Sequence, residues 1–592
     1  MSYRKLLIIS LITIFSCQKK ESTYENIVVK EKEKLNVIWI IAEDLSPDLS
    51  CYGNNGIVNT KNIDQLAHQG MLFNNAFSTS PYGEPSRSAI FTGTYPHVIG
   101  MQHVDPGKDN SNIIPPADVK VFTEYLRANG YYCSLRGNTP VPFSEAATTW
   151  DQISSPSDSN EYRYAWENRP KDTPFFSTIY LSQTEEKYNL PEKELEEVLA
   201  KEYPDLPKSE ILALVKKISD SPEFENIKID KKKIKLPGYL ANSNKIKDDF
   251  VRMYLNIKRL DNQVGSILQQ LKTDKLDKNT VVFFFSENGR GLPGSKRWLY
   301  DGGIQVPLII KFPGVTHGGA VNSQLVSLID LAPTLLSNLD IRIPEYMQGL
   351  VFLGKRKHPA REYIFAARDR IGEADEKLRC IRNEKFKYIR NYTKEAPFDE
   401  PFDILDRFPT VEIMKNVKKR RNSKQDEGLV KFTSKKTTEE LYDIKNDPNE
   451  LVNLAERDYF LDDLAAMRKQ YNRLEGEIGG FINTPEDEMR LAMQPDSEYE
   501  LITEAPSFSE EGGELENPKD LNITCSTAGA SILYAYLPDG ETDIHWKVYH
   551  EPILIDQSCT ILSKAVRYGF EESAIKSISF KIPNELSAKI YQ

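Results

Sequence analysis

Two continuous apolar runs mark the first half of the chain. NVIWII begins at Asn36 and TVVFFF begins at Thr280. Neither run alternates with polar positions, so both are expected to be strands buried on two faces. Between them, residues 251–271 place apolar side chains at three- and four-residue steps along one helical stripe. Strands that alternate with such helices predict a doubly wound α/β fold with a mostly parallel sheet, whose ligands lie beyond the carboxyl ends of the strands.

Later patterns divide the chain further. KFKYIRNY predicts a strand and FLDDLAAMRKQYNRLEGEI an amphipathic helix, together a smaller α+β subdomain. An acidic, irregular stretch follows, without apolar periodicity, and predicts a linker. Short alternating runs separated by turn residues then predict a terminal all-β sandwich. The predicted parts are the α/β domain at 35–360, the subdomain at 361–482, the acidic linker at 483–505 and the β-sandwich at 506–585.

The first residues, 1–17, have the pattern of a secretory signal. Arg4 and Lys5 precede an apolar run that is too short to span a membrane as a helix. A small residue directly before Cys17 resembles a bacterial lipobox, in which the cysteine is lipidated after cleavage; the alternative is a plain signal peptide. We therefore expect an exported protein, periplasmic or at the cell surface, that reaches a membrane only through an N-terminal lipid anchor.

Charge and cysteine content exclude several classes of function. The formal net charge is -11 over 592 residues, so the field of the whole protein does not attract polyanions and nucleic-acid binding is not expected. The 6 cysteines are widely spaced without a CxxC motif, which excludes a disulfide scaffold and a zinc site. Nothing in the sequence specifies an oligomeric state.

Acidic and amide side chains follow both predicted strands. Glu43 and Asp44 come directly after the first run, and Glu287 and Asn288 after the second. The carboxyl ends of neighbouring parallel strands meet at one edge of a sheet, so these side chains are expected to lie together. An all-oxygen set suits Ca²⁺ or Mg²⁺ better than zinc.

The segment GEPSRSAIFTG at 83–93 carries a resemblance to a known family. It resembles the sulfatases of the alkaline phosphatase superfamily, whose signature is Cys or Ser, any residue, Pro-Ser-Arg and, after a helix start, Thr-Gly. NVIWIIAEDLSPDLSCYG, TGTYPHVIG, KRWLYDGGIQVPLII and ELYDIKNDPNELVNLA are similar to segments of the heparan N-sulfatase-like branch. The resemblance covers residues 35–480 and implies the alkaline phosphatase type of α/β fold.

The terminal sandwich resembles a second known type of domain. A Tyr-x-x-Pro-Ile turn at Tyr549–Ile553 and the later segment AVRYGFEES are similar to the chitobiase/β-hexosaminidase C-terminal domain. Such domains are accessory modules of glycan-active proteins. The resemblance leaves two roles open, carbohydrate binding and a spacer that stabilises the main domain.

The resemblance assigns roles to individual positions. In the family, the first signature residue is converted to formylglycine, whose hydrate attacks the sulfur of the ester. Gly83 stands there and has no β-carbon, so formylglycine cannot form. Arg87 fits the arginine that orients the formylglycine, and Lys296 fits the lysine that contacts the sulfate ester. His103 fits a histidine on the substrate side.

Other family positions are altered as well. Asn138 stands where the family has a sulfate-binding lysine, and Glu185 where it has a histidine that assists the leaving group. An amide and a carboxylate at these places make the pocket less favourable to an anion. The two pairs of metal-ligand positions fall on Glu43, Asp44, Glu287 and Asn288. At one of them, Glu287 is one methylene longer than the usual aspartate.

These departures predict a pseudosulfatase, a sulfatase-like protein for sulfated glycans whose hydrolysis is impaired or absent. One alternative is an active sulfuric-ester hydrolase on sulfated carbohydrates such as glycosaminoglycans, with metal-activated water as nucleophile. The loss of a covalent nucleophile would cost such an enzyme several powers of ten in rate. A second alternative is a metal-stabilised structural partner without a ligand.

Overall fold

The structure is a computed structural model that describes residues 34–54, 56–104, 113–155, 162–219, 227–420, 430–493 and 501–583. The predicted signal segment with its lipobox cysteine, Cys17, lies outside these ranges. No helix within them is long and apolar enough to cross a membrane.

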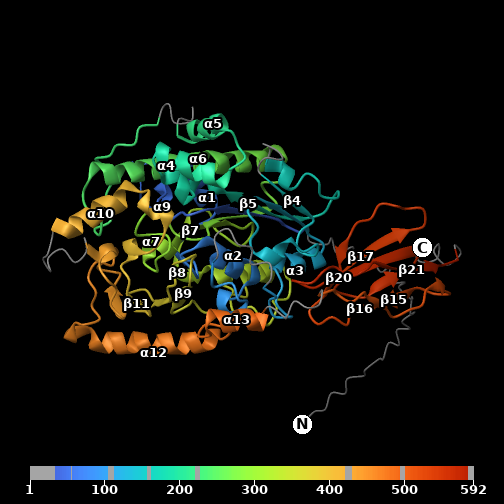
Figure 1. The fold of residues 1–592 in the computed structure, drawn as a ribbon. Coiled ribbons are helices and arrows are strands. Elements are labelled where there is room, and N and C mark those ends of the chain that lie inside the picture. Colours follow the sequence, from blue (N-terminus) through green and yellow to red (C-terminus); the bar gives the residue numbers. More distant parts are fainter. Residues whose placement is uncertain are drawn as a thin grey trace, which may run out of the picture. The chain divides into compact units, whose positions relative to one another are not determined.

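An eight-stranded sheet forms the centre of the first domain (Figure 1). Its strand order is β4-β3-β5-β1-β6-β7-β2-β8, and every neighbouring pair is parallel except the two made by β7. The predicted doubly wound, mostly parallel sheet is confirmed. The strands are β1 (Asn36–Ala42), β2 (Met71–Phe77), β3 (Tyr132–Arg136), β4 (Gln152–Ser154), β5 (Phe175–Leu181), β6 (Thr280–Ser286), β7 (Gln305–Lys311) and β8 (Ala320–Ser327).

Helices cover both faces of this sheet. Alternate residues of β1 point to opposite faces, so Ile38 and Ile40 join one buried cluster while Val37, Trp39 and Ile41 join another. The first cluster includes α1 (Lys61–Gln69), α4 (Glu192–Glu202), α5 (Lys208–Ser219), α6 (Asn244–Thr273) and α10 (Pro409–Arg420). The second includes α2 (Gly83–Thr92), α3 (Phe122–Ala128) and α8 (Leu331–Asn338). Two short helices are α7 (Asp301–Ile304) and α9 (Asp403–Asp406).

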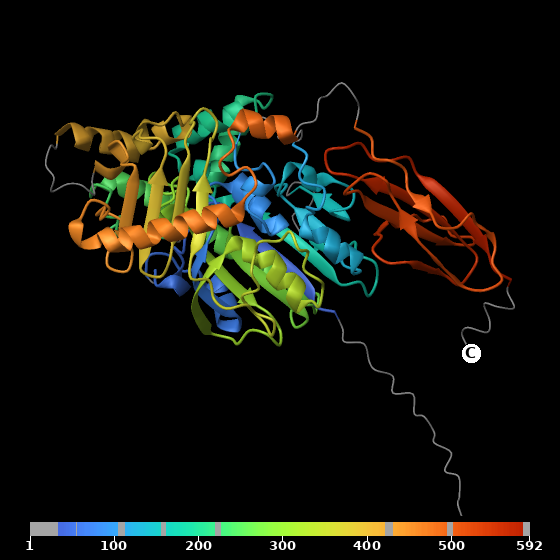
Figure 2. The same cartoon turned by 90° about the horizontal axis from the view of Figure 1, so that it is seen from below.

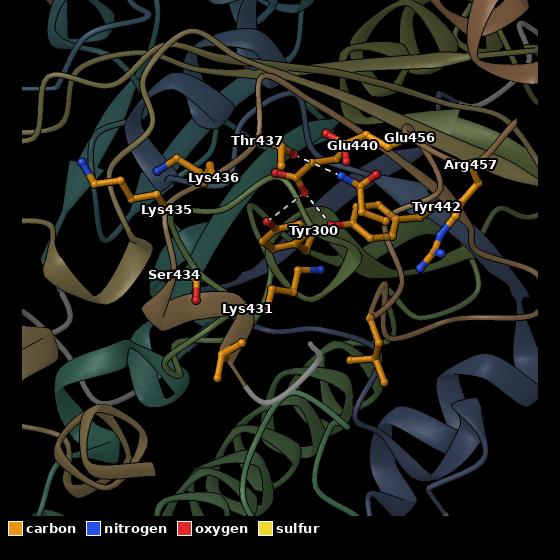
Figure 3. Close-up of a pocket in the computed structure, with 13 residues that line it drawn as sticks. Tyr300, Lys431, Ser434, Lys435, Lys436, Thr437, Glu440, Tyr442, Glu456 and Arg457 are labelled. Carbon is orange, nitrogen blue, oxygen red and sulfur yellow. Dashed lines mark hydrogen bonds between the residues drawn. The ribbon is translucent and has the colours of Figure 1, made fainter. Parts of the chain in front are cut away.

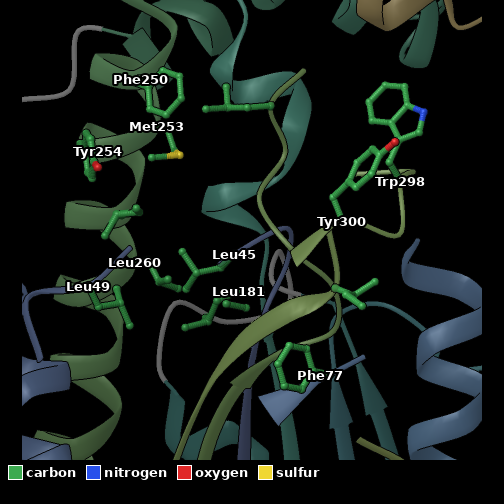
Figure 4. Packing of buried hydrophobic residues seen from close by; sticks show 14 of the residues in the cluster. Leu45, Leu49, Phe77, Leu181, Phe250, Met253, Tyr254, Leu260, Trp298 and Tyr300 are labelled. Atoms are coloured by element: carbon green, nitrogen blue, oxygen red, sulfur yellow. The ribbon is translucent and has the colours of Figure 1, made fainter. Parts of the chain in front are cut away.

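The long helix α6 fixes the loops that leave the sheet. Its apolar stripe includes Phe250, Met253 and Leu260, which are in one cluster with Leu45 and Leu181 (Figure 4). Leu45 follows the carboxyl end of β1, and Leu181 is the last residue of β5. The predicted helical stripe therefore anchors the edge of the sheet where the candidate site lies.

A second sheet of four antiparallel strands carries α12 (Leu461–Ile478) against one face (Figure 2). Its order is β12-β11-β10-β9. The strands are β9 (Ile364–Arg368), β10 (Leu378–Arg382), β11 (Phe386–Asn391) and β12 (Glu439–Asp443). The predicted smaller α+β part is present.

The predicted linker at 483–505 differs from the structure in its first half. Residues Glu486–Met493 form α13, and Met489 and Met493 are buried in the cluster that covers the large sheet. Arg370 reinforces this contact by binding both carboxylate oxygens of Glu486 at 2.6 Å. The segment was predicted as an unpacked linker because it is acidic, and this prediction is wrong for residues 486–493. Two methionines one helical turn apart give the helix a buried side.

The C-terminal part is an all-β module, as predicted. Its main sheet has the order β14-β21-β20-β17-β18, and two short pairs, β13-β16 and β15-β19, complete it. The strands are β13 (Ser507–Phe508), β14 (Gly513–Glu514), β15 (Lys519–Leu521), β16 (Ile523–Thr524), β17 (Ser531–Pro538), β18 (Lys547–Val548), β19 (Ile553–Ile555), β20 (Cys559–Val566) and β21 (Lys576–Lys581). Its likeness to the chitobiase C-terminal type stays a prediction.

Glu124 of α3 joins this module to the first domain. The hydroxyl of Tyr568 donates to one of its carboxylate oxygens, and Ser531 Oγ donates to the other at 2.5 Å. Tyr568 also accepts a hydrogen bond from the backbone N–H of Val121 at 3.1 Å and stacks on Phe143. Because Glu124 is 3% exposed, these donors replace the water that a carboxylate requires.

We expect Tyr568→Phe to loosen the module from the first domain. The change removes one donor to a buried carboxylate, which costs about 1–3 kcal/mol. Calorimetry should show a lower transition temperature, and peptides of β17 and β20 should exchange hydrogen faster. Tyr534→Phe is the matched control, because no hydrogen bond to the Tyr534 hydroxyl is present within the described part of the chain. Equal behaviour of the two variants would refute the role of Glu124.

Candidate functional site

The carboxyl ends of β1 and β6 bring the predicted acidic residues together. Ala42 pairs with Ser286 in parallel register, so the residues that follow each strand emerge side by side. The hydroxyl of Ser286 donates to the carbonyl of Ala42 at 3.0 Å and accepts from the N–H of Leu45 at 3.0 Å. This hydrogen bonding fixes the two loops against each other.

Helix α2 places Gly83 at the same edge. Phe91 of this helix packs edge-on against Trp39 of β1, with ring centroids 5.5 Å apart. Ser86 Oγ donates to the carbonyl of Glu287 at 2.5 Å, which ties the first turn of the helix to the loop after β6. Ser86 therefore has a structural role, and the motif holds Gly83 directly against Glu287.

An ion pair fills the space beside Gly83. A β-carbon on Gly83 would clash with Glu287 Oε1 and would lie 2.6 Å from Arg87 Nη1. Arg87 Nη1 donates to both carboxylate oxygens of Glu287, at 3.2 and 3.0 Å, and the two side chains are 17% and 4% exposed. A side chain at position 83 would require the ends of Glu287 and Arg87 to move from this arrangement.

A second ion pair holds Asp44. Lys296 donates to Asp44 Oδ2 at 2.7 Å, Asn288 Nδ2 donates to Oδ1 at 2.9 Å, and the N–H of Glu186 donates to Oδ2 at 2.8 Å. Although burial opposes it, the carboxylate of Asp44 raises the pKa of Lys296 above its usual range. Asp44 has a φ of 50°, which is uncommon for a residue with a side chain and is typical of functional sites.

Asn138 and Glu185 complete the surroundings of Glu43. Asn138 Nδ2 donates to Glu43 Oε1, and Lys187 lies 3.3 Å from Glu185. Burial raises the pKa of Glu43 well above its ordinary value, and the carboxylates of Glu185 and Glu287 add to the effect. Burial likewise raises the pKa of Glu185. The structure thus brings both altered family positions beside the predicted metal ligands.

The predicted metal ligands do not fit a cation as they are arranged. Of their side-chain oxygens, Glu43 Oε2 and Asn288 Oδ1 are buried without a hydrogen-bond partner, which suits a cation ligand. Asp44 and Glu287, however, each bind a cationic side chain. Among the described residues, no group of three or more His, Cys, Asp or Glu side chains is placed to hold a metal ion. Ca²⁺ takes six to eight oxygen ligands, so with two uncommitted side-chain oxygens most of them would have to come from water, backbone carbonyls or a rearrangement of the ion pairs.

A cavity of about 260 Å³ opens beside this cluster. Asn138 and Tyr180 line it together with residues at the ends of β4 and β5, among them Ser154 and Ser182. The hydroxyl of Tyr180 is buried without a hydrogen-bond partner among the described residues, and burial raises its pKa. The polar side chains that line the cavity, among them Asn138 and Ser182, are uncharged.

His103 is not placed with the other predicted residues. Its Nδ1 lies 3.4 Å from Glu486 of α13, and burial lowers the pKa of His103. The described hydrogen bonds and ion pairs do not connect it to Gly83 or to the acidic cluster. Its prediction as a substrate contact is untested.

Two residues near the site, Tyr180 and Arg297, were not predicted from the sequence. Tyr180 lies at the end of a buried strand, where its hydroxyl has no distinguishing pattern. Arg297 follows Lys296 and binds both oxygens of Glu186, at 2.7 and 2.6 Å. The backbone N–H of Glu186 donates to Asp44. By holding Glu186, Arg297 therefore helps to position Asp44 for its ion pair with Lys296. The adjacent basic residues at 296 and 297 were the available signal.

Comparisons with known proteins identify the family of the chain. Residues 35–341 match the family model described as sulfatase, and residues 294–426 match the model described as N-sulphoglucosamine sulphohydrolase, C-terminal. An ulvan-active sulfatase of Formosa agariphila is 34% identical over 97% of this chain and 98% of its own length. The N-sulphoglucosamine sulphohydrolase of Homo sapiens is 24% identical over 75% of this chain and 90% of its own.

Solved structures show the same fold. A protein in complex with its substrate D-glucosamine-2-N,6-O-disulfate is similar with a TM-score of 0.54 and 18% identity, over 77% of this chain and 99% of that one. A 2-O GAG sulfatase gives a TM-score of 0.54 and 18% identity, over 78% and 96% of the two chains.

Gly83→Ala should lower the free energy of unfolding by about 1–3 kcal/mol, because the new methyl group overpacks against Glu287 and Arg87. In a Glu287→Asp background the acid is shorter, and the cost of Gly83→Ala should fall by about 1 kcal/mol. Chemical denaturation of the four proteins gives this coupling directly.

Gly476→Ala is the matched glycine control, because a β-carbon there meets nothing within 4 Å. It should stabilise α12 by up to about 1 kcal/mol. A Gly83→Ala protein as stable as the parent, with no coupling to position 287, would show that the space beside Gly83 is open.

Proposed function

Since this chain belongs to the sulfatase family, we propose that it binds sulfated carbohydrate and does not carry out the formylglycine-dependent hydrolysis of the sulfate ester. One observation supports this most strongly. The position that the first side-chain atom of the nucleophile would take is filled by the buried pair of Arg87 and Glu287. Without an oxygen on residue 83, no covalent intermediate can form.

The ligand class is supported by the relatives and by the cavity. The relatives described above are named for ulvan and for sulfated glucosamine. The cavity at Asn138 and Ser182 would accept a sulfate group or a sugar hydroxyl through neutral polar side chains. Neutral donors hold an oxyanion less tightly than cations do, so we expect moderate affinity and release of the intact ester.

Family members generally use a divalent metal ion. The finer expectation, Ca²⁺ or Mg²⁺ at Glu43, Asp44, Glu287 and Asn288, is a separate hypothesis. A cation would have to displace Lys296 from Asp44 or Arg87 from Glu287. We propose that these two ion pairs supply most of the charge neutralisation at this edge of the sheet.

An active sulfuric-ester hydrolase is the second candidate. The 34% identity to an ulvan-active sulfatase over nearly the whole chain favours it. Such an enzyme would need a nucleophile other than residue 83. Export, the lipid anchor and a carbohydrate-binding role of the terminal β module stay predictions.

Sulfate release separates the two candidates. The full chain is incubated with sulfated glycosaminoglycan and algal oligosaccharides, with an active sulfatase as positive control, and free sulfate is measured by ion chromatography. We expect no release, together with a rise in the melting temperature caused by one or more of the intact oligosaccharides. Release that Asn288→Ala abolishes would contradict the proposal.

Gly83→Cys, produced in a host with the formylglycine-generating enzyme, should also release no sulfate. Glu287 and Arg87 would have to move to make room for the new side chain, and Asn138 and Glu185 do not supply the family's cationic contacts. Turnover by this single variant would show that the rest of the site is competent, and would reduce the proposal to the loss of one side chain.

A titration with Ca²⁺ tests the cation hypothesis. Because a cation must break an existing ion pair, we expect the melting temperature to rise by less than about 1 °C at 1 mM Ca²⁺. A larger, saturable rise that Glu43→Gln removes would establish a metal site.

A further inference from the structure

A second cavity, of about 470 Å³, lies at the edge of the smaller sheet (Figure 3). Tyr300 and Tyr442 line it, and so do Lys431 and the loop that leads into β12. It shares no lining residue with the candidate site described above. Its volume lies in the range of pockets that take small organic ligands.

Lys431 lies at the aromatic wall of this cavity. Its Nζ is 3.5 Å from the ring centroid of Tyr300 and 4.4 Å from that of Tyr442. It donates one hydrogen bond, to the backbone carbonyl of Glu450. An ammonium group has three donors. Among the described residues, no carboxylate lies within ion-pair distance of Lys431 Nζ, and the neighbouring carboxylate of Glu450 pairs with Lys387. Ring faces and a carbonyl thus hold a cation that has no anionic partner.

The nearest acid of the wall is already committed. Glu440 accepts hydrogen bonds from the hydroxyls of Tyr300 at 3.1 Å and Tyr442 at 2.6 Å (Figure 3). It also accepts one from Asn391 at 2.6 Å. Glu440 therefore orients the two rings so that their faces lie against Lys431. The donors also disperse its charge, which reduces its repulsion of an anion.

The rim of the cavity adds further positive charge. Lys435 and Arg457 are exposed and line the opening, and neither has an ion-pair partner within the described part of the chain. Glu456 is the one acid of the rim residues. The positive charges at the wall and the rim are complementary to the acidic group of an anionic sugar, and the aromatic rings are complementary to its apolar face.

We propose that this cavity binds an anionic saccharide, with Lys431 contacting the sulfate or carboxylate oxyanion and Lys435 and Arg457 attracting it at the rim. The site is independent of the candidate site at Gly83. It would hold a sulfated or uronate-containing chain whether or not that site hydrolyses an ester.

The state of Lys431 makes the site accessible to chemical labelling. Burial lowers the pKa of Lys431 to about 8, against the opposing influence of the carboxylates of Glu450 and Glu440. Lys387 lowers this pKa as well, and Asp447 raises it. A substantial neutral fraction is thus present at pH 8, where an ordinary lysine is almost fully protonated and reacts more slowly.

The test is the rate of acetylation of Lys431 in the full chain at pH 8, followed by peptide mass spectrometry. The probes are glucose 6-sulfate, glucuronate and uncharged glucose. We expect glucose 6-sulfate, glucuronate or both to slow labelling of Lys431 in a saturable way, and glucose to have no effect. Labelling of Lys445, an exposed lysine outside the cavity, should not change. The two charged probes distinguish a sulfate from a carboxylate as the recognised group.

Variants of the rim supply a control that does not disturb the fold. Lys435→Gln combined with Arg457→Gln should raise the half-protecting concentration about fivefold, the size of two exposed charge pairs. Lys445→Gln should leave it unchanged. Asn138→Ala, in the candidate site, should also leave it unchanged, so failure here and failure of the proposed function are distinguishable. Labelling that no charged sugar slows, or that glucose slows equally, would overturn the proposal.

Discussion

The ion pair between Arg87 and Glu287 is the constraint on which the rest of the site depends. Glu287 is buried and Arg87 is half-buried, and breaking a fully buried pair by removing one partner typically costs about 3–5 kcal/mol. The carboxylate lies at the first turn of α2, where the backbone N–H groups of a helix favour negative charge. Gly83 leaves space for the pair, and a β-carbon at position 83 would require the ends of both side chains to move.

The residues around this pair also bind one another. Glu287 binds Arg87, and Lys296 binds Asp44. Asn138 turns its amide to Glu43. Under the proposed function, this site and an active sulfatase site share a fold and most of a sequence motif but differ in which charges are paired with each other. The residues at these positions form one connected network of hydrogen bonds and ion pairs, in which each pairing depends on its neighbours.

Much of the architecture was predictable because it depends on periodicity. The buried strands β1 and β6, the stripe on α6 and the all-β module follow from patterns of apolar residues. The meeting of Glu43, Asp44, Glu287 and Asn288 follows from parallel pairing. α13 was missed because two buried methionines sit in an acidic segment whose packing partner lies far away in the chain. The partners of Arg87 and Lys296, and the cavity at Lys431, depend on side chains from separate elements and leave no local pattern.

The most direct measurement is the distance between Arg87 Nη1 and Glu287 Oε2 in a crystal structure of the full chain grown with Ca²⁺ and a sulfated oligosaccharide. The account predicts a direct ion pair close to the 3.0 Å found here, with Gly83 against it and the sulfate ester intact. A structure in which Glu287 and Asp44 turn together onto Ca²⁺, and Arg87 faces open space above Gly83, would contradict it.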